Sequence, residues 1–286
     1  MVFIGQHIND NRTKNMKQNK PLTGPLIQTK IPGKNSQAWI DRLALRECPA
    51  ITARRSRRAM TLGTAKDDPI VWKQAEGSVV QDVDGNCFID LTAGFGVAAV
   101  GHRNPKVVES AHHQLDILIH AMGDAFADPT RIELLDELQK RTGFERGILG
   151  CSGSDSVEAA LKTARIATGR KKILAFGRSY HGLAFGSLPA TNYKTESFKA
   201  PFQSWLGTHV EHFDFGGELP KDLHDFAGVI VEPIQGRGGI RVAPPHWLRD
   251  LIDLANRDGA MVIFDEIYTG FGRTGQWFAF EHEDLE

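Results

Sequence analysis

The chain has 286 residues, of which 41% are hydrophobic, and its formal net charge at pH 7 is −1. A chain of this length and composition can bury a substantial core. The balanced charge argues against nucleic-acid and anionic-membrane partners, and no apolar run approaches the ~20 residues that a transmembrane helix needs.

The N-terminal part divides into a tail and an arm. Residues 1–20 are polar and rich in Asn and Lys, which predicts a disordered tail without the apolar segment of a signal peptide. Residues 21–75 contain several Pro and Gly residues, and we expect an extended arm and a small-domain segment with a helix over Ser36–Arg46. The basic run Arg54–Arg58 has no interleaved aromatic residues, so it indicates a solvated linker or a subunit contact.

Three cysteines, Cys48, Cys87 and Cys151, are widely spaced and odd in number. They predict reduced thiols rather than a disulfide framework or a metal site. Together with the polar N-terminus, they favour a cytoplasmic protein without a metal ion.

Residues 76–286 are predicted to form a large α/β domain. Ser78–Asp90 has the pattern of a hairpin with Asp84–Gly85 at its turn. Further along, apolar runs alternate with helical patterns, which is typical of a mainly parallel sheet. The predicted strands are Gly147–Cys151, Lys172–Phe176, Val210–Phe213, Gly228–Val231 and Met261–Phe264, and the clearest helices are Asp155–Thr168 and His246–Asp258.

The first candidate site lies where a predicted strand ends and a helix begins. Gly153 lets a ligand approach the backbone closely, and Ser152 and Ser154 supply hydroxyls. The first N–H groups of a helix have no partner within it, so this segment suits a phosphate. A plain helix N-cap is the alternative.

Two later strands are each followed by an acid and a glycine-containing turn. Glu232 follows one strand, and Asp265 follows the next. Because the carboxyl ends of parallel strands meet at one edge of a sheet, the two carboxylates are expected to converge on one cleft. A carboxylate that faces a pyridine nitrogen would keep this nitrogen protonated, since an opposite charge favours the charged form.

Four segments in this order and spacing, SGSDSVEAALK, SYHG, VEPIQG and FDEIYTGFGRTG, resemble the class III aminotransferases, which use pyridoxal phosphate (PLP). DVDGNCFIDLTAGFGVAAVGHRNP resembles the entry segment of the same family, and the resemblance covers Gly24 to the C-terminus. It implies the PLP-dependent transferase fold type I. This is an α/β fold with a mainly parallel sheet in a large domain and an N-terminal small-domain segment, and here its C-terminal part is expected to be absent.

The resemblance also implies roles for the matching residues. Gly153 and Ser154 would bind the phosphate, Tyr180 and Ile267 would cover the two ring faces, Asp265 would pair with the ring nitrogen, Glu232 would support the site, and Phe95 would line the substrate pocket. His181 belongs to the motif without an assigned contact.

Two positions depart from the family pattern. Family members commonly carry Gln where this chain has Tyr268, near the 3-oxygen of the cofactor, and Tyr can still donate a hydrogen bond there. Enzymes that act on 4-aminobutyrate or ornithine usually carry Glu at the position of Arg237, so Arg237 argues against those two substrates. Arg237 could bind a substrate carboxylate or face solvent.

The lysine that holds PLP in this family is expected roughly eight residues beyond Glu286. Lys199 and Lys221 lie outside any matching motif. We therefore expect a C-terminally truncated chain that has no catalytic residue of its own and lacks two strands from the middle of the family sheet. Alone, such a chain would be unstable or prone to aggregate.

For the full-length protein, the resemblance implies transamination between an amino acid or ω-amine donor and a 2-oxo acid, in a homodimer. An amino-acid racemase, an epimerase or a PLP lyase of the same fold is one alternative. The arm segment GPLIQTKIPGKNSQAW resembles both 4-aminobutyrate aminotransferases and racemases, so it does not decide between them. An inactive remnant that binds a phosphorylated ligand or a partner chain is the alternative from another class.

Overall fold

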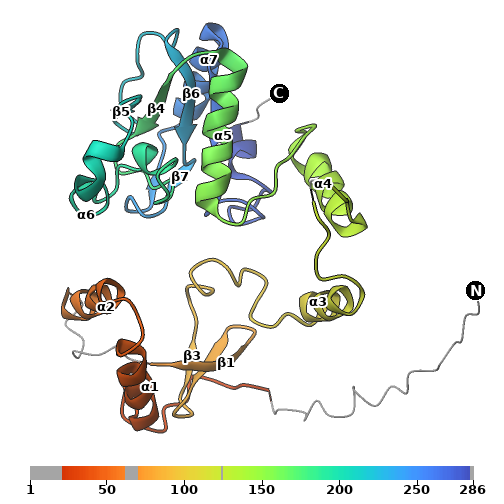
Figure 1. Ribbon diagram of the computed structural model, residues 1–286, viewed down its shortest axis with the longest axis vertical. Helices are drawn as coiled ribbons and strands as arrows, with labels where there is room; N and C mark the ends of the chain where they lie inside the picture. Colours follow the sequence, from red (N-terminus) through yellow and green to blue (C-terminus); the bar gives the residue numbers. More distant parts are fainter. Residues whose placement is uncertain (1–20, 62–69, 124, 284–286) are drawn as a thin grey trace, which may run out of the picture. The chain divides into compact units, whose positions relative to one another are not determined.

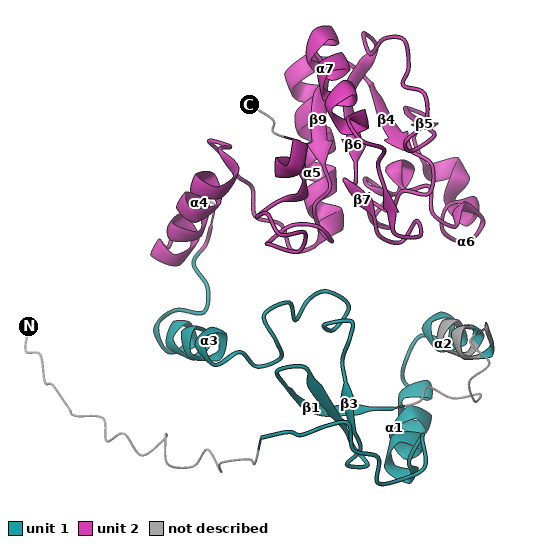
Figure 2. Cartoon of the chain, turned by 180° about the vertical axis from the view of Figure 1, so that it is seen from behind, with its two compact units in different colours: residues 1–121 teal, residues 122–286 magenta. Residues whose placement is uncertain are grey.

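The computed structural model describes residues 21–61, 70–123 and 125–283. The chain forms two compact units, residues 1–121 and 122–286 (Figures 1 and 2). The predicted tail lies outside the described residues. The domain boundary near residue 75 stays a prediction, since a division into compact units does not test which residues form the cofactor-binding domain.

The first unit is built on a small antiparallel sheet. Its strands β1 (Trp72–Glu76), β2 (Val79–Asp82) and β3 (Cys87–Ile89) lie in the order β1-β2-β3. The predicted hairpin is confirmed, because β2 pairs with β3 in antiparallel register. The N-terminal arm adds one further bridge, from Leu26 to Cys87.

The described part of this unit also contains the helices α1 (Lys34–Ala44), α2 (Pro49–Thr61) and α3 (Pro105–Ile117). Helix α1 confirms the predicted helix with a start two residues earlier. Its N-terminus is capped by the hairpin turn, because the carboxylate of Asp84 accepts hydrogen bonds from the backbone N–H groups of Asn35 (2.7 Å) and Ser36 (2.8 Å). The basic run Arg54–Arg58, for which the sequence indicates a linker or a subunit contact, lies within α2.

The second unit contains the parallel sheet (Figure 1). Its order is β5-β4-β6-β9, from β4 (Lys172–Phe176), β5 (Val210–Phe213), β6 (Phe226–Val231) and β9 (Met261–Phe264). These strands confirm four of the five predicted ones. The remaining elements are α4 (Pro129–Thr142), α5 (Gly153–Thr168), η2 (Leu188–Ala190), α6 (Thr195–Phe198), η3 (Ala200–Trp205), β7 (Ile234–Gln235), β8 (Arg241–Val242), α7 (Trp247–Asp258) and η4 (Ala279–Glu283).

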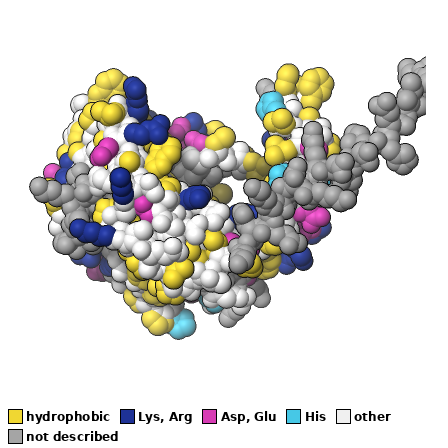
Figure 3. Space-filling model, turned by 90° about the horizontal axis from the view of Figure 1, so that it is seen from below, with side chains coloured by type: hydrophobic (Ala, Val, Ile, Leu, Met, Phe, Trp, Pro, Cys, Tyr) yellow, Lys and Arg dark blue, Asp and Glu magenta, His cyan; other side chains and the backbone are white. Residues whose placement is uncertain are grey.

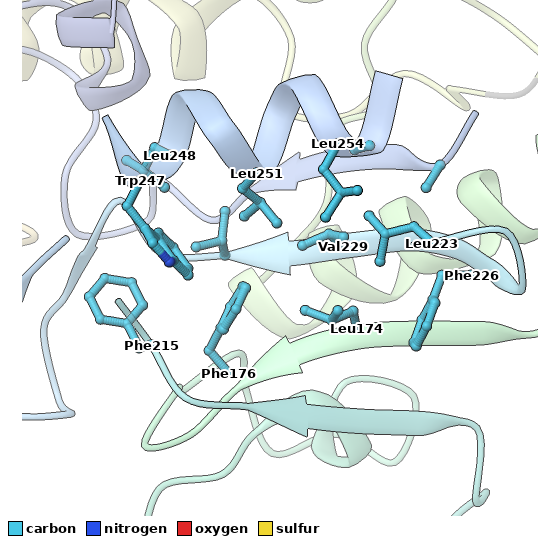
Figure 4. Close-up of a cluster of buried hydrophobic side chains, with 13 residues drawn as sticks. Leu174, Phe176, Phe215, Leu223, Phe226, Val229, Trp247, Leu248, Leu251 and Leu254 are labelled. Carbon is cyan, nitrogen blue, oxygen red and sulfur yellow. The ribbon is translucent and has the colours of Figure 1, made fainter. Parts of the chain in front are cut away.

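Helices α5 and α7 cover opposite faces of this sheet, each over its own buried cluster. Leu174 and Phe176 of β4 pack toward α7 and its Leu251, as Figure 4 shows, whereas Ile173 and Ala175 pack toward α5. Successive side chains of a strand point to opposite faces, so each strand contributes to both clusters. Burying a side chain such as Leu251 stabilises the fold by about 1.5–3 kcal/mol.

The predicted strand Gly147–Cys151 is wrong. The segment is irregular, and Ile148 is 75% exposed. A strand needs a neighbour for its backbone hydrogen bonds. Among the described residues, β9 ends the sheet and no strand lies on its outer side.

The surface is mixed in character. Figure 3 shows apolar, basic and acidic side chains together on one face. In the described ranges, no helix is long and apolar enough to cross a membrane.

Candidate functional site

Three loops leave the carboxyl ends of β4, β6 and β9 and meet at one edge of the sheet. Val231 of β6 accepts a hydrogen bond from the backbone N–H of Asp265 (2.8 Å), so the ends of β6 and β9 stay in register beyond the strands. The loop after β4 carries Ser179–Gly182. As predicted for parallel strands, this edge brings Glu232 and Asp265 into one region.

Glu232 ties two of these loops together. Its Oε1 accepts a hydrogen bond from the Tyr180 N–H (2.9 Å), and its Oε2 accepts one from the Gly236 N–H (3.2 Å). The residue is only 4% exposed. Burial raises the pKa of Glu232, because removal from water disfavours the carboxylate, and the two backbone donors oppose this effect. Glu232 therefore acts through the loops that it holds.

Asp265 and His181 form a buried pair. The distance from His181 Nδ1 to Asp265 Oδ2 is 2.7 Å, and the side chains are 0% and 4% exposed. The second carboxylate oxygen of Asp265 accepts a hydrogen bond from the Ile267 N–H (3.2 Å). His181 Nε2 is buried without a hydrogen-bond partner in the described part of the chain. This pair fixes the orientation of the carboxylate.

The N-terminus of α5 faces the same loops. Ser152 caps the helix and accepts a hydrogen bond from the Asp155 N–H (3.2 Å). Among the described residues, the backbone N–H groups of Gly153 and Ser154 have no acceptor. The Ser154 hydroxyl accepts a hydrogen bond from the Leu183 N–H (3.3 Å), which joins the helix to the loop after β4. Two unpaired N–H groups and a hydroxyl form a donor set that suits a phosphate.

Two glycines allow close packing here. A Cβ atom on Gly153 would lie 2.5 Å from Ile267 Cδ1, and one on Gly182 would lie 2.2 Å from Ser154 Oγ. Gly182 also has a φ of +110°, which residues other than glycine rarely adopt. The helix N-terminus therefore contacts both the loop after β4 and the loop after β9.

Tyr180 lies half-buried beside Arg237. The Arg237 guanidinium carbon is 4.1 Å from the centre of the Tyr180 ring, a cation–π distance. Tyr193 and Phe198 meet the same ring edge-on, each at 6.4 Å between ring centroids. Arg237 thus occupies one ring face, and stacking on a ligand would use the other face or require Arg237 to move.

The remaining predicted site residues are Tyr268, Ile267 and Phe95, and they differ in packing and exposure. Tyr268 packs closely against Gly236, since a Cβ atom on this glycine would lie 3.3 Å from Tyr268 Cδ2. Ile267 is 58% exposed beside Gly153, and Phe95 is 60% exposed with a φ of +65°. Phe95 belongs to the first unit, so its role in the substrate pocket stays a prediction.

Glu266, the second acid of the motif, has a different role from Asp265. Its carboxylate accepts hydrogen bonds from the N–H groups of Ala279 (3.0 Å) and Phe280 (2.9 Å) and from the Thr269 hydroxyl. These contacts support the start of η4. The second acid of the motif is therefore structural.

The profile of the family described as "Aminotransferase class-III" matches residues 62–286. The chain belongs to the class III aminotransferase family. PLP is the cofactor of this family. The α/β fold with a parallel sheet and the motif positions both agree with this membership.

Curated relatives are similar over most of the chain. An acetylornithine aminotransferase of Methanosarcina acetivorans is 39% identical over 220 residues, which are 76% of this chain and 55% of the relative. A [LysW]-aminoadipate semialdehyde/glutamate semialdehyde transaminase of Sulfolobus acidocaldarius is 40% identical over 74% of this chain and 55% of its own length. The chain therefore spans a little over half the length of these relatives.

Solved structures support the fold. The ornithine aminotransferase of Toxoplasma gondii aligns with a TM-score of 0.70 at 24% identity, over 88% of this chain and 61% of that chain. A taurine:2-oxoglutarate aminotransferase of Bifidobacterium kashiwanohense, in complex with PLP and glutamate, aligns with a TM-score of 0.69 over 83% of this chain and 59% of that chain.

Proposed function

We propose that this protein binds PLP at the edge formed by α5 and the loops after β4, β6 and β9, and that the whole protein catalyses transamination. The observation that carries the proposal is the buried Asp265 carboxylate, fixed by His181, on the same edge as the unpaired N–H groups of Gly153 and Ser154 in the described part of the chain. This combination offers one group for a ring nitrogen and another for a phosphate.

Each residue has a defined task in this proposal. Gly153 and Ser154 bind the phosphate through their N–H groups and the Ser154 hydroxyl. Asp265 holds a proton on the ring nitrogen, because its charge favours the protonated nitrogen. When bound, PLP supplies an electron sink for the amino substrate.

The ring faces and rim are assigned by the same proposal. Tyr180 and Ile267 cover the two faces of the ring, and Tyr268 donates a hydrogen bond to the 3-oxygen. Glu232 supports the site by holding the Tyr180 N–H. Arg237, which contacts the Tyr180 ring, can pair with a substrate carboxylate. Phe95 of the first unit would line the substrate pocket, a role that rests on the family resemblance alone.

The substrates of the proposed reaction are an amino acid or ω-amine donor and a 2-oxo acid acceptor. Relatives are described as acetylornithine aminotransferases, and Arg237 argues against 4-aminobutyrate and ornithine themselves. Transamination is favoured over racemisation and PLP-lyase chemistry because the curated relatives are described as transaminases. A homodimer in the cytoplasm and a PLP-holding lysine beyond Glu286 remain parts of the proposal.

Product analysis tests this function. The protein expressed from its intact reading frame is incubated with PLP, an amino donor and a 2-oxo acid. Transamination yields the oxo product of the donor in proportion to the newly formed amino acid. Loss of optical activity without an oxo product would instead support a racemase, and saturable PLP binding without any turnover would support the inactive remnant.

A further inference from the structure

Thr191 lies outside every motif of the sequence, yet it contacts the loop that carries Tyr180 and His181. It is 0% exposed. Its hydroxyl accepts a hydrogen bond from the His181 N–H (2.9 Å) and donates one to the Gly182 carbonyl (2.8 Å). The Thr191 hydroxyl therefore holds both ends of the His181–Gly182 segment.

The segment that bears Thr191 is itself held firmly. The Ala190 carbonyl accepts hydrogen bonds from the Ser179 hydroxyl (2.9 Å) and from His212 Nε2 (3.2 Å). Burial lowers the pKa of His212 to about 4, so this ring is neutral at pH 7 and carries its proton on Nε2. The Lys199 ammonium donates to the Pro189 carbonyl (2.8 Å). The Thr191 hydroxyl is thus presented from a fixed support.

Three contacts depend on the position of the His181–Gly182 segment. His181 bonds Asp265 through Nδ1, Gly182 packs on the Ser154 hydroxyl, and the neighbouring Tyr180 N–H bonds Glu232. A shift of this peptide would therefore disturb the phosphate end and the ring-nitrogen end of the site together.

We infer that Thr191 is a positioning residue for the cofactor site, one that sets the Tyr180–Gly182 turn against Asp265 and Ser154. The inference rests on the proposed function, since it takes PLP as the ligand that the turn serves. Thr191 acts through these residues and has no role in contacting the cofactor itself.

The side chain chemistry defines the test. Thr191→Ser keeps the hydroxyl, whereas Thr191→Val keeps the shape but leaves the His181 N–H and the Gly182 carbonyl unpaired in a buried place. Thr168→Val is the matched control, because the Thr168 hydroxyl also donates to a backbone carbonyl, that of Ala164 (2.8 Å), on the last turn of α5.

The full chain and the three variants are titrated with PLP, and amide hydrogen exchange is followed at His181. We expect Thr191→Val to raise the Kd for PLP about tenfold and to speed exchange of the His181 N–H. Thr191→Ser should restore both values, and Thr168→Val should leave both unchanged. If Thr191→Val does not fold, Ser179→Ala replaces it, because it removes one support of Ala190 and should raise the Kd about threefold.

The outcomes separate the two proposals. Wild-type affinity and exchange in Thr191→Val, or in Ser179→Ala where it replaces that variant, would overturn the inference and leave the proposed function intact. The absence of saturable PLP binding by the wild-type chain would overturn the proposed function and this inference with it. A purely structural role would lower the stability of Thr191→Val but not the affinity of its folded molecules, which also contradicts the inference.

Discussion

At the residue scale, the two strand-end acids do different work. Asp265 makes a short contact to His181 and one to a backbone N–H, whereas Glu232 accepts only from backbone N–H groups. Burial raises the pKa of Glu232, so this residue ionises less readily than an ordinary glutamate. The site therefore holds one carboxylate suited to a charged partner and another suited to joining loops.

Glu232 predicts a pH dependence of stability. Its pKa is higher in the folded chain than in the unfolded chain, so between these two values the folded state binds more protons and stability falls as pH rises. The decrease in the free energy of unfolding should begin near pH 4.5, the ordinary pKa of a glutamate, and continue above it. We expect Glu232→Gln to abolish this decrease, because glutamine does not ionise. The measurement is the free energy of unfolding by denaturant against pH. Parallel curves for the two proteins would refute the prediction.

Gly182 predicts a steric effect that can be separated from backbone strain. Gly182 has a φ of +110°, and a Cβ atom added there would clash with Ser154. Gly239 has a similar φ of +116°, but a Cβ atom added there would have no atom within 4 Å. Backbone strain alone costs about 1–3 kcal/mol. We expect Gly182→Ala to lower the free energy of unfolding more than Gly239→Ala does, and to weaken PLP binding. Denaturant unfolding and PLP titration of both variants measure these effects. If the two variants lose the same stability and the same PLP affinity, the steric explanation is wrong.

Sequence reasoning identified some of these residues and missed others for a physical reason. Asp265 and Glu232 follow buried apolar runs, and parallel strands bring such ends together whatever the loops do. Thr191 follows no strand end, and its contact to His181 spans ten residues of irregular chain. No local pattern encodes such a contact, so only the folded chain reveals it.

At the element scale, burial on both sheet faces accounts for the strands that were predicted. Strand β6 is buried along its whole length, and continuous apolar runs are typical of a parallel strand between two helix layers. The segment 147–151 has a similar composition but no neighbouring strand among the described residues, so composition alone gave a wrong prediction there.

Two of the helices that were not predicted, α3 and α4, have their start signals in the sequence. Asn104 and Asp128 each accept a hydrogen bond from the first turn of the following helix, and each is followed by a proline. This N-cap and Pro pair marks the beginning of α3 and of α4. These signals are local, so both helix starts are encoded in the sequence itself.

The packing of α7 predicts a large loss of stability for one substitution. Leu251 is 0% exposed and lies in the cluster between α7 and the sheet (Figure 4). We expect Leu251→Ala to lower the free energy of unfolding by about 2–5 kcal/mol, because it removes buried methyl groups and leaves a cavity. Ile166→Ala, at a helix position that is 84% exposed, is the control and should change it by under about 0.5 kcal/mol. Similar values for both variants in urea denaturation would contradict this view of the core.

At the scale of the whole molecule, the outer edge of β9 is one of the two open edges of the parallel sheet in the described residues. Among the described residues no strand pairs with it, and Met261 at its start is 44% exposed. Unpaired edges next to apolar surface promote pairing between chains. The predicted instability of the chain alone has this edge as its physical basis.

Self-association through this edge is testable. We expect the chain to show a mass well above its 31.6 kDa in light scattering, with a broad distribution. Met261→Lys should reduce the association, because a charge on an edge strand opposes pairing, whereas Ile166→Lys on α5 should not. A narrow mass distribution at 31.6 kDa would contradict the prediction.

The central claim is that one end of the site holds a phosphate and the other holds a pyridine nitrogen. Pyridoxine 5′-phosphate and pyridoxine lack the aldehyde, so their binding reports these two ends without any lysine bond. The most direct measurement is the Kd of both ligands for the wild-type chain, Ser154→Ala and Asp265→Asn, with Asp253→Asn as a surface control. We predict that Ser154→Ala weakens only the phosphorylated ligand, by about tenfold, and that Asp265→Asn weakens both. Equal effects of Ser154→Ala on the two ligands, or no effect of Asp265→Asn on either, would contradict the account.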